Sequence, residues 1–174
     1  LCRVAVAAPA ADPAAARAEF DAASADMKRI VGEAAVLQAK WHQPDADKPA
    51  LAKKFDALES EGRKVGQRLE AAAIALVQAE PAHAEARKIC GAAVAAALQS
   101  DDPERALADA TAVAEAGAAE PDVCVMAATA ALVLSRLDEA EAWVGKAAQA
   151  GAPADRTAEL RDGIAKSREK VDAE

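Results

Sequence analysis

Two long stretches of the chain carry apolar or small residues at alternating intervals of three and four positions. This spacing lines one side of a helix and is typical of a coiled-coil seam. Residues 42–49 separate the stretches and are rich in Pro and Asp, which interrupt helices. The pattern predicts an antiparallel helical hairpin over residues 12–80, with Asp12 as the first cap and Pro13 at the first helical position. The seam positions are Phe20, Ala23, Met27, Ile30, Ala34, Leu37 and Trp41, then Leu51, Phe55, Leu58, Gly62, Val65, Leu69, Ala72 and Leu76.

Beyond the hairpin, the pattern recurs at a spacing of 34 residues, and residues 88–122 align with residues 122–156 without a gap. Most of the matching positions are alanines, which coincide easily in an alanine-rich chain. Matches between residues of other types are therefore stronger evidence for a repeat, and they are Cys90 with Cys124, Leu98 with Leu132 and Gly117 with Gly151. The sequence of each unit predicts a helix, a short turn and a second helix, followed by a glycine in the left-handed conformation.

A 34-residue period of helix pairs resembles the tetratricopeptide repeat family, here over residues 82–156 as two repeats. The small residue that the family keeps in its second helix matches Ala106 and Ala140. The aromatic position of the family's first helix instead holds Cys90 and Cys124. The resemblance therefore implies helix pairs that pack small residues against small residues.

Composition supports an all-α fold, because alanine dominates the apolar residues and aromatic residues make up only 2% of the chain. Alanine is the best helix former and a poor strand former. Only a short piece at 123–125 favours a strand. Residues 157–174 predict a C-terminal capping helix or a linker. Residues 1–11 predict a disordered leader or a signal-peptide remnant, since Ala5-Val6-Ala7 has a small-x-small pattern. This favours a periplasmic or exported protein, with a cytoplasmic one as the alternative.

The charges and cysteines argue against several classes of function. The net charge of -8 is spread along the chain, which argues against nucleic acid and anionic membrane surfaces. No apolar run is long enough to predict a membrane span. Cys90 and Cys124 are expected to be small buried residues and not a redox pair. Cys2 could be a reactive thiol or a lipid attachment point. No metal, phosphate or cofactor motif is found, and His42 and His83 are expected to be exposed.

The resemblance to tetratricopeptide repeats also implies a partner groove on the face formed by the first helices. The family's clamp for a terminal carboxylate is reduced here to a single cation, Lys88. We therefore expect a small, apolar groove that suits an apolar helix, including the chain's own tail. Trp143 is expected to pack inside the fold, with a peptide contact as the alternative. The predicted groove residues are Lys88, Ala95, Leu98, Gln99, Asp122, Val125, Thr129, Leu132 and Val133.

A second resemblance covers most of the chain and is carried by segments such as Phe55-Asp56-Ala57-Leu58 and Asp138-Glu139-Ala140-Glu141. The chain resembles the N-terminal helical region of exported cyclophilin-type peptidyl-prolyl isomerases of planctomycete-like bacteria. This implies an accessory part without the β-barrel catalyst, whose partner is a protein, a peptide or an adjoining domain of the same parent chain. We expect an interaction scaffold and no enzyme. The alternatives are a structural or oligomerising hairpin and, less favoured, an enzyme.

Overall fold

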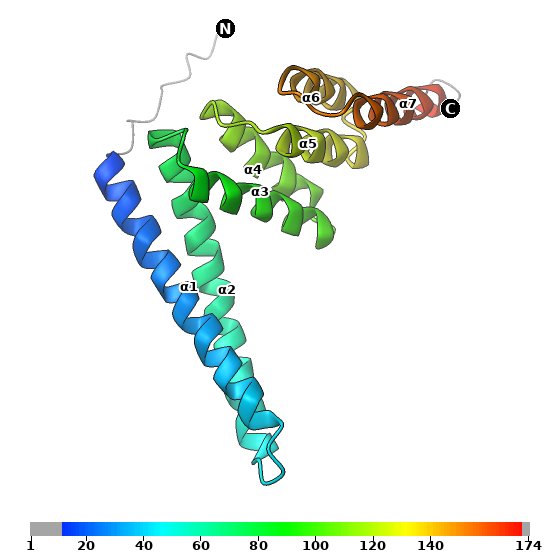
Figure 1. Cartoon of the computed structure of the whole chain (residues 1–174). Coiled ribbons are helices and arrows are strands. Elements are labelled where there is room, and N and C mark those ends of the chain that lie inside the picture. The colour runs from blue at the N-terminus through cyan, green and yellow to red at the C-terminus, as the bar shows by residue number, and fades with distance from the viewer. Residues whose placement is uncertain (1–11, 172–174) are drawn as a thin grey trace, which may run out of the picture. The chain divides into compact units, whose positions relative to one another are not determined.

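The computed structural model describes residues 12–171, which form helices joined by short turns (Figure 1). The structure is 84% helical, and the described residues form seven helices and no strand. The prediction of an all-α fold is therefore confirmed. The predicted leader, residues 1–11, lies outside the described residues.

The chain divides into two compact units, Leu1–Leu76 and Val77–Glu174. The division falls inside the last turns of α2, so this helix contributes residues to both units.

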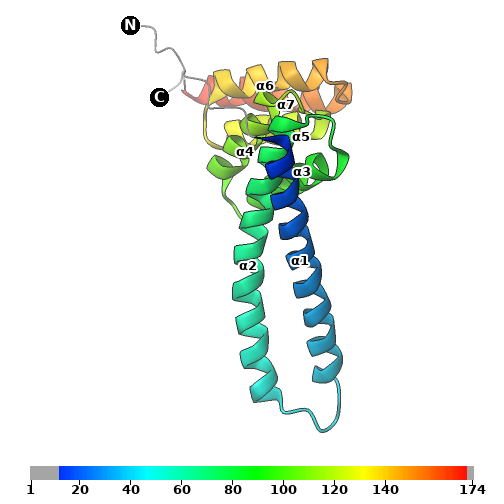
Figure 2. The same cartoon turned by 90° about the vertical axis from the view of Figure 1, so that its left-hand side faces the viewer.

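The first unit contains two long helices, α1 (Pro13–Trp41) and most of α2 (Lys48–Ala79), which run antiparallel side by side (Figures 1 and 2). The side chain of Asp12 accepts a hydrogen bond from the backbone N–H of Ala14 at 3.0 Å, and Pro13 is the first helical residue. Both features agree with the sequence pattern. The carboxylate of Asp47 caps α2 in the same way, accepting from the N–H of Ala50 at 3.1 Å.

The seam of the hairpin is only partly enclosed. Its buried members lie toward the ends of the helices and at one level near the middle, and they are Phe20, Ala23, Ile30, Leu51, Leu58, Ala72 and Leu76. The other seam positions, including Met27 and Phe55, are half-buried. A two-helix hairpin has no third layer, so large seam residues shield one another from one side only.

The second unit is built from five helices in chain order. Each helix packs against the next from α3 to α7, and α5 also contacts both α3 and α7. Helices α3, α5 and α7 therefore lie beside one another in a row. The helices are α3 (Ala84–Gln99), α4 (Pro103–Glu115), α5 (Pro121–Val133), α6 (Leu137–Gln149) and α7 (Ala154–Val171).

The turns of the second unit recur at the 34-residue spacing seen in the sequence. Asp101 and Ser135 end α3 and α5, and both have φ of 57°. In each case the next backbone N–H donates to a carbonyl five residues earlier, at 2.9 Å and 2.8 Å respectively. Gly117 and Gly151 end α4 and α6 with φ of 73° and 93°. This is the Schellman arrangement, which satisfies the last carbonyls of a helix, and it confirms the left-handed glycines.

Small residues fill the contacts between these helices. Ala106 and Ala140 are fully buried, and Cys90 and Cys124 are buried at equivalent positions of α3 and α5. A small side chain at a crossing lets two helix backbones approach closely. Trp143 on α6 is the one large aromatic side chain of this unit, and it is buried.

The left-handed Ser135 gives a direct test of these turns. A residue other than glycine in this conformation brings its Cβ too close to the following carbonyl. We expect Ser135→Gly to raise the free energy of unfolding of the second unit by about 1 kcal/mol. Denaturant unfolding followed by Trp143 fluorescence, in a Trp41→Phe background, measures this unit alone.

The matched control is the reverse exchange at Gly117, where an added Cβ would meet no atom within 4 Å. Gly117→Ser should therefore lose about 1 kcal/mol through the backbone alone. A loss of stability in Ser135→Gly would show that this turn is not under the strain inferred here.

Candidate functional site

The strongest candidate surface lies on the hairpin, where the two helices meet through side chains and few of their Cα atoms come within 8 Å. This separation leaves apolar hollows along the seam. We call one of them the first hollow. It is lined by Arg29, Gly32, Glu33, Val36, Leu37, Lys54, Ala57, Leu58 and Glu61. The second hollow is lined by Met27, Ile30, Ala34, Phe55, Leu58, Glu59, Gly62 and Arg63.

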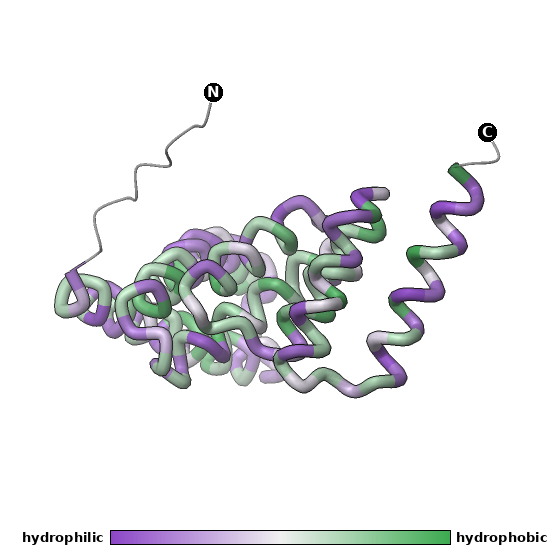
Figure 3. Tube along the Cα trace, turned by 90° about the horizontal axis from the view of Figure 1, so that it is seen from above, coloured by the Kyte–Doolittle hydropathy of each residue, from purple (hydrophilic) through white to green (hydrophobic). Residues whose placement is uncertain are grey.

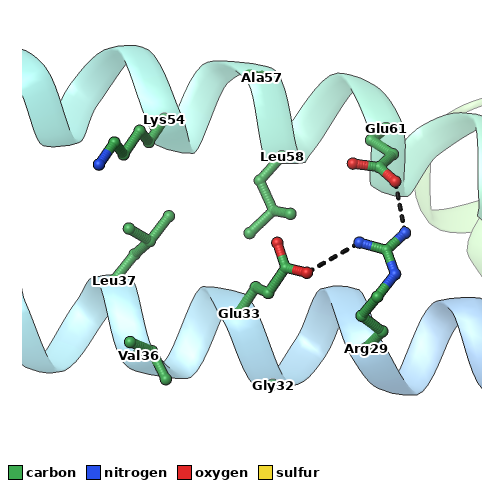
Figure 4. Close-up of a pocket in the computed structure, with 9 residues that line it drawn as sticks. All are labelled: Arg29, Gly32, Glu33, Val36, Leu37, Lys54, Ala57, Leu58 and Glu61. Atoms are coloured by element: carbon green, nitrogen blue, oxygen red, sulfur yellow. Dashed lines mark hydrogen bonds and ion pairs between the residues drawn. The ribbon is translucent and has the colours of Figure 1, made fainter.

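Charged groups frame the two ends of the first hollow, and Leu58 and Glu33 lie between them (Figure 4). At one end, the guanidinium of Arg29 donates to Glu33 on its own helix at 2.9 Å and to Glu61 on α2 at 2.5 Å. The hydrogen bond to Glu61, followed by the one to Glu33, raises the pKa of Arg29. At the other end, Lys54 and Leu37 face one another across the gap (Figure 4).

An exposed valine completes the first hollow. Val36 lines it and keeps 54% of its surface exposed. Val31, on the same helix, is 61% exposed but does not line the first hollow. An apolar hollow with polar groups around it is the usual form of a protein-binding surface.

A second set of ion pairs fixes how α1 and α2 are aligned. Arg68 of α2 donates to Glu19 at 2.6 Å and to Asp26 at 2.8 Å, and both acceptors belong to α1. The hydrogen bond from Arg68 lowers the pKa of the Glu19 carboxyl, so this group stays ionised. Near the turn, the rings of Trp41 and Phe55 pack edge to face with centroids 6.0 Å apart. Contacts at both ends of the hairpin thus hold the hollows in one arrangement.

The groove predicted from the tetratricopeptide resemblance lies on α3 and α5, and the structure gives its members different environments. Val125 is buried. Lys88, Gln99, Asp122 and Val133 are exposed, whereas Ala95, Leu98, Thr129 and Leu132 are half-buried. The hydroxyl of Thr129 donates to the carbonyl of Val125, one turn earlier on the same helix.

Helix α7 lies against the α5 part of this groove. Arg156 of α7 pairs with Asp122 at 3.2 Å, and the Cδ2 of Leu132 lies 3.2 Å from the place a Cβ would take on Gly163. Ile164 of α7 is buried. Hydrophilic and hydrophobic positions alternate along α7, as Figure 3 shows. The chain's own tail therefore contacts part of the predicted groove.

The groups considered for chemistry are in ordinary structural settings. His42 ends α1 and is exposed, as expected. His83 is half-buried and not exposed, because its Nδ1 caps α3 by accepting from the N–H of Ala86 at 3.2 Å. Burial raises the pKa of the Cys124 thiol, and the charge of Lys146 offsets this in part. The ammonium of Lys146 also lies 3.9 Å from the centre of the Trp143 ring.

Between residues 12 and 171, no cluster of three or more His, Cys, Asp or Glu side chains is placed to hold a metal ion. None of the helices in that range is both long enough and apolar enough to cross a membrane.

Sequence reasoning did not single out the residues that frame the first hollow. Arg29, Val36, Lys54 and Glu61 flank the predicted seam, where charged residues usually serve solubility. A signal was present, because Val31 and Val36 are apolar residues outside the three-and-four spacing. Comparison with protein-family models, curated proteins and solved structures found no match to this chain.

The close contact between α7 and α5 predicts different outcomes for two glycines. An alanine in place of a helical glycine gains about 1 kcal/mol of helix propensity. Gly145 has open space around its Cβ position, so Gly145→Ala should show this full gain in the unfolding free energy of the second unit. Gly163→Ala must displace Leu132 and should gain clearly less or lose stability. Equal gains in denaturant unfolding would contradict the packing of α7 described here.

The raised pKa of Cys124 predicts how stability changes at alkaline pH. The unfolded thiol ionises near pH 8.5, whereas the buried thiol keeps its proton to higher pH. Its contribution to stability is therefore intact below about pH 8.5 and is lost as pH rises toward the raised pKa. We expect the fall in unfolding free energy between about pH 8.5 and pH 10 to be smaller in Cys124→Ala. Mass-spectrometric mapping should also show slow alkylation of native Cys124 and fast alkylation in urea.

Proposed function

We propose that this chain is a non-catalytic protein–protein interaction scaffold. The observation that carries the proposal is the first hollow, an apolar surface on a long hairpin with Val36 half exposed and charges at both ends. Such a surface is costly to leave in water and gains free energy when a partner covers it. The environments of His83 and Cys124 support a role without chemistry, since one caps a helix and the other has a raised thiol pKa.

A finer part of the proposal concerns the second unit, which we propose to be a pair of tetratricopeptide-like repeats capped by α7. The recurrence of turn conformations and of buried small residues at a spacing of 34 supports this. We further propose, from the sequence resemblance, that the chain serves as the accessory region of an exported peptidyl-prolyl isomerase. The partner is then a separate protein or peptide, or an adjoining domain of the same parent chain.

Site-specific photocrosslinking in cells tests the scaffold. A benzophenone amino acid at Val36 reports on the first hollow, and one at Val133 reports on the predicted groove. Ala158, exposed on α7, is the matched control position. We expect irradiation to give a discrete adduct with another protein at Val36 and none at Ala158, and the partner, identified by mass spectrometry, should bind the purified chain.

Two results would overturn this proposal. The first is the absence of any adduct at both Val36 and Val133 under conditions in which the chain is folded. The second is catalysis of proline isomerisation by this chain alone, measured with a short proline-containing peptide, for which we expect the uncatalysed rate. Adducts formed at Val36 only between copies of the chain would favour the oligomerising hairpin.

A further inference from the structure

The charges around the first hollow indicate what kind of partner can bind over it. We propose that a second copy of this chain docks over the first hollow, so that two hairpins pack antiparallel about a two-fold axis. This inference rests on the proposed role of the hairpin as a binding surface, and it adds a second copy as a weak occupant that competes there with the other protein. It also answers what would cover Val36, which has no third helix above it within a two-helix hairpin.

Opposite charges at the two ends of the hollow make this surface self-complementary. On α2, Lys54 and Glu61 are about equally far from the middle of the hollow, which falls between Ala57 and Leu58. A two-fold axis that lies in the plane of the interface and crosses both helices at this middle exchanges the two ends of the hollow. It therefore brings Lys54 of each copy beside Glu61 of the other, and it forms this contact twice.

The α1 side of the hollow is compatible with the same two-fold axis. On α1, Arg29 and Val36 are equally far from the middle, which falls between Gly32 and Glu33. The axis thus places Val36 of one copy over the methylene stem of Arg29 in the other. Arginine stems bury well against apolar side chains while their charged ends stay solvated. The intramolecular pair of Arg29 with Glu61 holds both groups in place beforehand.

The second hollow does not have this symmetry. Glu59 lies at the middle of its α2 side, between Phe55 and Arg63. An equivalent axis there would bring the two copies of Glu59 together, much as the axis through the first hollow does for Glu33, and it would place Arg63 opposite Phe55. The second hollow therefore gains no opposite-charge contact to offset the like charges at its axis, whereas the first hollow gains the contact of Lys54 with Glu61 twice. The first hollow is therefore the favoured face.

The size of the contact predicts a weak dimer. The axis pairs residues 24–41 of α1 and 48–67 of α2 with their symmetry mates. That overlap is about 28 Å long and about 20 Å wide, or about 1,100 Å² summed over both copies. Specific interfaces usually bury about 1,200–2,000 Å², and smaller ones are transient. We expect a dissociation constant on the order of 10 µM.

Analytical ultracentrifugation of the full chain at rising concentration measures this equilibrium. Val36→Lys places a cation beside Arg29 of the other copy and should weaken the dimer at least about tenfold. Val31→Lys is the matched control, because it makes the same exchange at an exposed valine of the same helix that does not line the hollow. It should leave the dissociation constant unchanged, and circular dichroism checks that both variants remain helical.

A charge-exchange experiment tests the two-fold axis itself. Lys54→Glu and Glu61→Lys each create two like-charge contacts between identical copies and should each weaken self-association. Mixing the two variants restores both opposite-charge contacts, so the mixture should form heterodimers more tightly than either variant forms homodimers. Lys53→Glu changes the net charge equally at a position that does not line the hollow and should have no effect.

The inference is overturned if the chain remains a monomer at several times the concentration expected for dimerisation, or if Val36→Lys and Val31→Lys behave alike. It is also overturned if mixing the two charge variants restores nothing. A monomeric chain that still crosslinks to another protein through Val36 would leave the scaffold proposal intact. A dimer without any other crosslinked partner would leave self-association intact and remove the broader scaffold role.

Discussion

A buried alanine removes little apolar surface from water, and both units of this chain are organised around that constraint. Burying one methyl group contributes about 0.8 kcal/mol, whereas a buried Val, Leu or Phe contributes about 1.5–3 kcal/mol. A core made of alanine must compensate by close backbone approach and by the low entropy cost of ordering alanine. In the second unit, Ala106 and Ala140 are fully buried at equivalent positions of α4 and α6. Helices can approach closely there because no larger side chain separates them.

The hairpin solves the same problem differently. Its few large residues, such as Phe20 and Leu58, hold α1 and α2 apart and are buried, while most of the seam between them is only half-buried. Cross-helix ion pairs from Arg29 and Arg68 then fix the alignment of the two helices. Exposed pairs of this kind contribute little to stability, so their main effect is to select one arrangement. The apolar hollows follow directly from large residues in a two-layer structure.

The tail of the chain shows how a structural role can limit a binding surface. Helix α7 contacts α5 at Gly163, which lies close to Leu132, and Arg156 pairs with Asp122, 34 positions earlier in the sequence. The α5 part of the expected groove is thus covered by the chain itself. In the proposed repeat arrangement, α7 would act as the terminal cap. The hairpin, which has no such cover within its unit, becomes the more accessible apolar surface.

The amino-acid sequence by itself determined the helices, their caps and the recurrence at 34 residues, because these depend on local spacing and turn chemistry. Asp12, Pro13 and Gly117 occupy the positions that their chemistry favours. Even Val123 and Val125, which favour strands, lie in α5, where burial outweighs local propensity. Only the tertiary structure decided that α7 covers Leu132 and that Arg29, Val36, Lys54 and Glu61 frame one hollow. Those residues lie up to 32 positions apart, and their proximity depends on the separation and alignment of two helices, which no local pattern encodes.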